Sequence, residues 1–285
     1  MAAIAAGKVK LITPRVDLPD GVLEEKNLEY GKVGDKSLEL DLYYPANLSK
    51  AVPALIFIHG GGWKGGNRSD YRYYTVRYAK RGYVVATISY RFAPENLFPA
   101  AVEDAKCAAR WLRANAGKYH VDPQKIGVLG GSAGGHLSMM VGYSSEVPEL
   151  DGPGGNAGVS SRVQAVVNLY GPCDLTTPFA QKADVVQGFI GKTYEEAPDL
   201  YAKASPITYL SKDDPPTLIL HGTIDDVVPI EQSDTLAMKL KELGVSCTYE
   251  KFEGWPHTMD LAEAVNERCR YFIDEFLDKN LPLPK

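Results

Sequence analysis

Largely apolar runs of strand length recur along the chain and constrain its fold more than any other feature. Continuous apolar character, without alternation, is typical of strands buried on both faces of a parallel sheet. The runs are Ala54–Ile58, Tyr83–Ile88, Ile126–Leu129, Val163–Leu169 and Thr217–Leu220. An earlier segment differs, because Leu38, Leu40 and Leu42 alternate with acidic residues. That alternation predicts a half-buried antiparallel strand near a sheet edge, after a polar N-terminal arm.

Helical periodicity fills the intervals between these runs. It predicts one helix that stops at Gly117, another that stops at Gly244, and a C-terminal helix whose apolar face extends from Leu261 to Phe276. A further strand pattern, Cys247–Phe252, predicts the last strand. The alternation predicts an α/β fold with a mostly parallel central sheet and helices on both faces. Its ligand site should lie at the carboxyl ends of the strands.

Two segments interrupt the alternation. Residues 148–162 are rich in Gly, Pro and Ser and predict a surface loop, whereas residues 173–210 contain only short helical patterns and predict a small cap insertion over the site. A length of 285 residues would fit two domains of about 150 residues each. The candidate site residues nevertheless extend from His59 to His257 and must converge on one sheet edge. We therefore expect a single domain over residues 1–285.

Charge and cysteine content exclude several classes of partner. A net charge of −5 argues against nucleic acid and anionic membranes, which need clustered Lys and Arg. The apolar start, Met1–Ala6, lacks a preceding basic region, so no signal peptide is predicted and a cytoplasmic location is expected. The four cysteines are dispersed without metal-ligand spacing. They predict buried free thiols, and we expect no metal and no cofactor.

The strongest motif is G-G-S-A-G at residues 130–134, directly after a predicted strand and before a helix-like segment. G-x-S-x-G in that context is typical of a nucleophilic serine on a sharp strand-to-helix turn, here Ser132. The alternative is a glycine-rich turn whose serine caps the helix. A second cluster, His59-Gly60-Gly61-Gly62-Trp63, follows another strand. The backbone N–H groups of Gly61, Gly62 and Ala133 are candidates to bind an oxyanion.

A serine nucleophile needs a base and an acid that orients the base. His257 is the candidate base, because it follows the last predicted strand in a loop before the C-terminal helix. His221 is interpreted as a strand-end residue and His59 as a support for the glycine loop. The acid should follow the strand Thr217–Leu220, where Asp225 and Asp226 compete. Asp225 is preferred, although spacing alone does not decide between them.

These stretches resemble the hormone-sensitive-lipase-like branch of the α/β-hydrolase carboxylesterases, within it the small-cap bacterial acetyl, xylan and feruloyl esterase-like group. The matching segments are His59–Trp63, Tyr90–Glu95, Phe98–Asp104, Gly130–Gly135 and His221–Pro229. In that family the acid is the first aspartate of H-G-x-x-D-x-x-V-P, which corresponds to Asp225.

The resemblance implies a serine carboxylesterase that acts through an acyl-enzyme on a small-molecule ester. The shortness of the insertions predicts short acyl chains. Trp63, Phe98 and Trp255 are candidates to line the substrate pocket. Two alternatives stay open: an amidase such as a kynurenine formamidase, and a non-catalytic receptor of the same fold. The presence of His257 argues against the receptor, because the plant gibberellin receptors that resemble this branch have lost the base.

Overall fold

The computed structural model describes residues 9–13 and 16–284, so the Met1–Ala6 segment lies outside the described residues. One eight-stranded sheet organises them in the order β1-β2-β4-β3-β5-β6-β7-β8. The first two strands pair antiparallel, β2 pairs antiparallel with β4, and the other neighbours are parallel. The strands are β1 (Val22–Val33), β2 (Lys36–Pro45), β3 (Val52–Ile58), β4 (Val84–Ile88), β5 (Val121–Gly131), β6 (Ala165–Leu169), β7 (Thr217–Gly222) and β8 (Cys247–Phe252).

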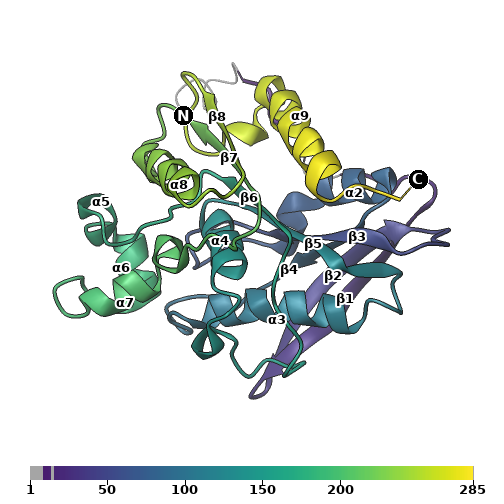
Figure 1. The fold of residues 1–285 in the computed structure, drawn as a ribbon, viewed down its shortest axis with the longest axis horizontal. Coiled ribbons are helices and arrows are strands. Elements are labelled where there is room, and N and C mark those ends of the chain that lie inside the picture. The colour runs from purple at the N-terminus through teal and green to yellow at the C-terminus, as the bar shows by residue number, and fades with distance from the viewer. Residues whose placement is uncertain (1–8, 14–15, 285) are drawn as a thin grey trace.

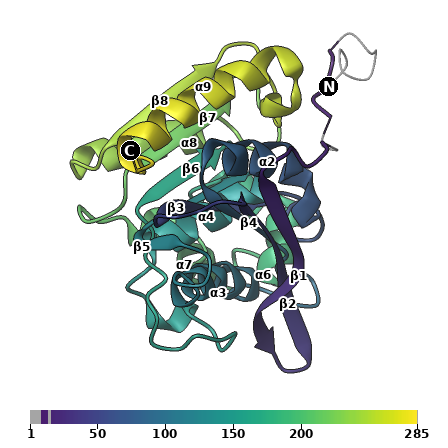
Figure 2. The same ribbon diagram turned by 90° about the vertical axis from the view of Figure 1, so that its right-hand side faces the viewer.

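Helices cover both faces of this sheet (Figures 1 and 2). One core contains side chains of α3 (Ala100–Ala114), α4 (Ala133–Tyr143) and α8 (Glu231–Glu242); the other contains those of α2 (Arg72–Arg81) and α9 (Glu263–Asn280). Alternate residues of β3 point to opposite cores: Ile56 and Ile58 to the first, Phe57 to the second. Both faces of β3 are therefore buried, which explains its continuous apolar run.

The predicted α/β-hydrolase architecture, with its mostly parallel sheet and small cap insertion, is confirmed. The cap region contains α5 (Pro178–Gln181), α6 (Asp184–Ile190), α7 (Pro198–Lys203) and the 3₁₀ turn η3 (Pro206–Tyr209), which project together from one end of the sheet (Figure 1). The remaining 3₁₀ turns are η1 (Arg68–Tyr71), η2 (Pro148–Leu150) and η4 (Met259–Leu261). Residues 148–162 form the predicted loop, and the Gly154 carbonyl accepts a hydrogen bond from the Lys32 N–H of β1.

The N-terminal region differs from the sequence prediction. The polar arm contains strand β1, which lies at the sheet edge and pairs with β2. On β2, Asp41 should face solvent by alternation, yet its side chain is buried and ion-paired with Arg68 at 2.9 Å. A buried carboxylate requires a charged or hydrogen-bonding partner, and Arg68 provides one. Asp41 can therefore be buried although it lies on the face of β2 opposite the leucines.

Candidate active site

Ser132 occupies the turn between β5 and α4 in a backbone conformation that few residues other than glycine adopt. Its φ is 56° and its ψ is −124°, and α4 begins at the next residue, Ala133. Such a strained conformation persists only where the surroundings enforce it, and it is common at functional sites. Gly134 permits the turn, because a Cβ there would lie 2.0 Å from the Ile58 carbonyl oxygen of β3. The hydroxyl of Ser132 is thereby presented at the carboxyl end of β5.

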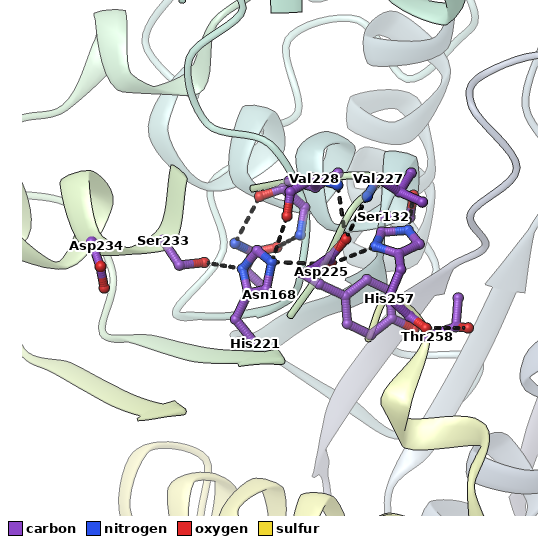
Figure 3. Close-up of polar contacts among 12 residues, drawn as sticks. Ser132, Asn168, His221, Asp225, Val227, Val228, Ser233, Asp234, His257 and Thr258 are labelled. Carbon is purple, nitrogen blue, oxygen red and sulfur yellow. Dashed lines mark hydrogen bonds and ion pairs between the residues drawn. The ribbon is translucent and has the colours of Figure 1, made fainter. Parts of the chain in front are cut away.

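Three side chains far apart in the sequence form one hydrogen-bonded chain (Figure 3). The His257 Nε2 atom lies 3.0 Å from Ser132 Oγ, and its Nδ1 atom lies 2.7 Å from Asp225 Oδ2. His257 belongs to the loop after β8, and Asp225 to the loop after β7. Their strands are parallel neighbours, so both loops leave the sheet at the same edge. The structure thus brings together the three residues that the sequence singled out.

The surroundings of Asp225 favour its ionised form. Its Oδ1 atom accepts hydrogen bonds from the N–H groups of Val227 at 2.9 Å and Val228 at 2.8 Å. Burial raises the pKa of Asp225, but hydrogen bonds from His221 and His257, the charge of His257 and the Val228 N–H outweigh burial, so the net pKa lies well below its usual value. The side chain of Asp226, the competing aspartate, is exposed.

The glycine loop that follows β3 lies against the serine turn. A Cβ on Gly60 would approach the Gly131 carbonyl oxygen to 2.9 Å, and one on Gly61 would lie 2.2 Å from the Gly65 carbonyl oxygen. His59 is fully buried beneath the loop, with Nδ1 2.8 Å from the Gly60 carbonyl oxygen. The sequence interpretation of His59 as a support for this loop agrees with that contact. Gly61 and Gly62 line the same cavity as Ser132.

A cavity of about 530 Å³ opens beside Ser132 on the η4 side. Tyr71 and Tyr170 form part of its wall, and Asp260 lies at its base with no exposed surface. The hydroxyls of Tyr170 and Tyr74 donate to the Asp260 carboxylate. Burial raises the pKa of Asp260, and these hydrogen bonds offset part of that rise. The remaining lining residues are Gly60, Gly61, Gly62, Gly66, Asp70, Gly131, Ser132, Val227, His257, Thr258 and Leu261.

None of the three aromatic residues expected in the substrate pocket lines this cavity. Trp63 is buried and stacks on Phe189 of α6 with ring centroids 4.5 Å apart. Phe98 is buried and meets the edge of the same Phe189 ring. Trp255 packs against the core beneath α9. Aromatic side chains stabilise a fold by burying a large apolar area, and here these three pack against the cap and the core.

Comparison with known proteins identifies the family of this chain. A model of the BD-FAE family matches residues 40–240, which include Ser132 and Asp225. The chain belongs to the BD-FAE family. It is 34% identical to esterase LipC of Mycobacterium tuberculosis over 229 residues, which are 75% of this chain and 55% of LipC. It is 32% identical to esterase LipQ of the same organism, over 86% of this chain and 59% of LipQ. The chain therefore spans between half and two thirds of these relatives' lengths.

A solved structure of esterase 2 from Thermogutta terrifontis, phosphoramylated by tabun, superposes with a TM-score of 0.80. The two chains are 29% identical, and the match covers 95% of this BD-FAE chain and 98% of the esterase. The likeness thus extends over nearly the whole fold described here, beyond the residues that the family model matches.

Two features of this BD-FAE site escaped the sequence interpretation. His221 contacts Asp225, and Asp260 with its tyrosines forms the cavity base. His221 carried a signal, because it lies four residues before the acid, whereas Asp260 meets Tyr170 and Tyr74 only through the fold. Among residues 9–13 and 16–284, no group of three His, Cys, Asp or Glu side chains could hold a metal ion. No helix in those ranges is long and apolar enough to cross a membrane.

Proposed function

We propose that this chain is a serine carboxylesterase that hydrolyses short-chain esters of small molecules through an acyl-enzyme. The observation that carries the proposal is the hydrogen-bonded chain Ser132–His257–Asp225 on a strained turn that faces a cavity. LipC, LipQ and the Thermogutta terrifontis enzyme are all named esterases, which supports the same chemistry here.

In the proposed mechanism, Ser132 Oγ attacks the ester carbonyl carbon while His257 Nε2 takes its proton. The carbonyl oxygen becomes an oxyanion, and His257 then gives the proton to the leaving alcohol as the C–O bond breaks. Water attacks the resulting acyl-serine by the same route and releases the carboxylic acid. Asp225 holds His257 with the proton on Nδ1 and stabilises the imidazolium that forms in each step.

The proposed oxyanion donors are the backbone N–H groups of Gly61, Gly62 and Ala133. Gly61 and Gly62 lie on the cavity wall with positive φ values of 107° and 59°, a backbone path that bulkier residues disfavour. Ala133 is the first residue of α4, where the helix dipole favours negative charge. Fixed donors of this kind are worth about 2.7–4 kcal/mol of transition-state stabilisation each in other enzymes.

The cavity lining favours an uncharged substrate group. The lining contains two carboxyl side chains, Asp70 and Asp260, and no Lys or Arg, while Tyr71, Val227 and Leu261 present apolar surface. A negatively charged substrate group placed there would find no Lys or Arg side chain among the lining residues. Solved structures of the Thermogutta terrifontis enzyme with propionate and with butyrate bound support short acyl chains.

Hydrolysis of a p-nitrophenyl ester series from acetate to decanoate tests the proposal, with Ser132→Ala as the matched variant. We expect the highest kcat/KM on acetate to butyrate, and a loss of about 10⁴-fold or more in Ser132→Ala with an unchanged circular dichroism spectrum. Equal turnover by the variant would refute the role of Ser132, and fastest hydrolysis of decanoate would refute the chain-length assignment. An N-formyl amide assayed in parallel separates esterase from amidase activity.

The role of Asp225 is tested against its exposed neighbour. Asp225→Asn should lower kcat by about 10³- to 10⁴-fold, because the amide no longer orients the imidazole with its proton on Nδ1. Asp226→Asn makes the same chemical change on an exposed side chain and should stay within about twofold of the wild type. A larger loss at Asp226 would assign the acid to that residue.

A further inference from the structure

We infer that His221 is a positioning residue that orients Asp225 and tunes the basicity of the His257–Asp225 pair. This inference rests on the proposed function. It concerns a second histidine on the carboxylate that holds the base (Figure 3). His221 is the penultimate residue of β7 and has no exposed surface.

The contacts of His221 determine which of its ring nitrogens carries the proton. Its Nε2 atom lies 3.1 Å from Asp225 Oδ2 and 2.9 Å from the Val228 carbonyl oxygen. Both of these atoms are acceptors, so Nε2 must be the donor. The Nδ1 atom lies 2.6 Å from the hydroxyl of Ser233 on α8, which can donate to it. A neutral imidazole with its proton on Nε2 therefore satisfies both ring nitrogens.

The two carboxylate oxygens of Asp225 have different partners. Oδ1 is held by the backbone N–H groups of Val227 and Val228, while Oδ2 is shared by the two imidazoles, His257 at 2.7 Å and His221 at 3.1 Å. The hydrogen bond from His221 draws negative charge away from the atom that His257 contacts. It also fixes the carboxylate plane. Its removal would concentrate charge on Oδ2 and strengthen the hold on an imidazolium.

The other charged groups near His221 form pairs of their own. Asp234 on α8, the residue after Ser233, is ion-paired with Lys251 of β8 at 2.7 Å and accepts from the Tyr249 hydroxyl at 2.8 Å. Among the described residues, the ionisable side chain hydrogen-bonded to His221 is Asp225, which is in turn hydrogen-bonded to His257. The effect of His221 on catalysis therefore passes through Asp225.

A matched pair of variants separates positioning from packing. His221→Gln keeps an N–H donor at nearly the reach of Nε2, whereas His221→Leu has similar bulk and no donor. For His221→Leu we expect kcat to fall about 10-fold, the factor that corresponds to one hydrogen bond to a charged group, with KM little changed. The acid limb of its kcat/KM profile should move to higher pH by about 0.5 unit or more, because negative charge then concentrates on Oδ2 and favours the imidazolium of His257. The two N–H groups on Oδ1 still hold the carboxylate in place. His221→Gln should recover most of kcat and the wild-type acid limb.

Ser233→Ala gives a milder variant in case a substitution at the buried position 221 prevents folding. It removes the partner of Nδ1 and should move the acid limb in the same direction by a smaller amount. Unchanged acid limbs in His221→Leu and Ser233→Ala would overturn the inference, as would equal kcat values for the Leu and Gln variants. These outcomes are read only against a wild type that hydrolyses esters and a Ser132→Ala variant that does not. Failure of that control would instead refute the proposed function.

Discussion

The two sides of Ser132 are built differently. On the cap side, Trp63, His136 and Phe189 form a closed layer, which we call the cap wall: Trp63 stacks on Phe189, and its Nε1–H donates to His136 Nδ1 at 3.1 Å. On the other side, the cavity lies open between the glycine loop and η4, with Val227 half exposed and Leu261 39% exposed. From this difference we expect the cap to stabilise the glycine loop, and residues near η4 to select the substrate.

The cap wall gives the largest expected effect. Trp63→Ala should lower the free energy of unfolding by about 3–5 kcal/mol, because it removes a buried aromatic side chain and leaves a cavity against Phe189. Urea denaturation measures this loss. Trp63→Phe retains a ring against Phe189 but not the donor to His136. Its free energy of unfolding should lie between those of the wild type and Trp63→Ala. If Trp63→Ala left stability intact and changed only KM, Trp63 would be a substrate contact after all.

The pH dependence of stability tests the same wall. Burial lowers the pKa of His136 to about 4, and its hydrogen bond to the Ala204 carbonyl offsets part of that effect. The unfolded chain, with a histidine pKa near 6.5, binds more protons between pH 6.5 and 4. The free energy of unfolding should therefore fall as pH decreases through this window, by up to about 1.4 kcal/mol per pH unit from this residue. The denaturation midpoints of the wild type and His136→Gln should differ most at pH 7, and this difference should shrink toward pH 4. A difference that stays constant with pH would contradict the prediction.

The open side gives the smallest expected effect and one confined to substrate. Leu261→Trp should reduce kcat/KM for an ester with a bulky alcohol by about 5- to 10-fold, equivalent to about 1 kcal/mol, with little effect on stability. Leu243→Trp, at a residue of similar exposure at the end of α8, is the control. Equal losses in the two variants would remove Leu261 from substrate selection.

The sequence predicts the buried strands well, because a parallel strand is apolar on both faces. Predicted Ala54–Ile58 lies within β3, in which every residue is buried. Predicted Cys247–Phe252 matches β8, although only Phe252 is buried in this edge strand. Strand β1 was missed because most of its side chains are at least partly exposed, so no periodicity marks it, and its partner is known only once the hairpin forms. Ser132, His257 and Asp225 were found because nucleophile turns and strand-end loops have local sequence patterns.

The side chains around these residues are harder to predict. Asp260 meets Tyr170 and Tyr74 across long stretches of chain, and no local pattern records that meeting. Trp63 was placed in the substrate pocket because of its neighbours in sequence, yet the direction of its ring depends on α6, which packs over the glycine loop. Sequence thus locates the residues proposed to react, and tertiary packing determines what surrounds them.

The surroundings of Asp225 have one further consequence. Apart from His257, every hydrogen-bond partner of its carboxylate lies within residues 221–233, as does the serine that holds His221. Asp225 is therefore held by one contiguous stretch of chain that folds onto itself at the end of β7. Because these contacts are made by neighbours in the chain, a substitution in the cap or in β1 would remove none of the hydrogen-bonding groups themselves.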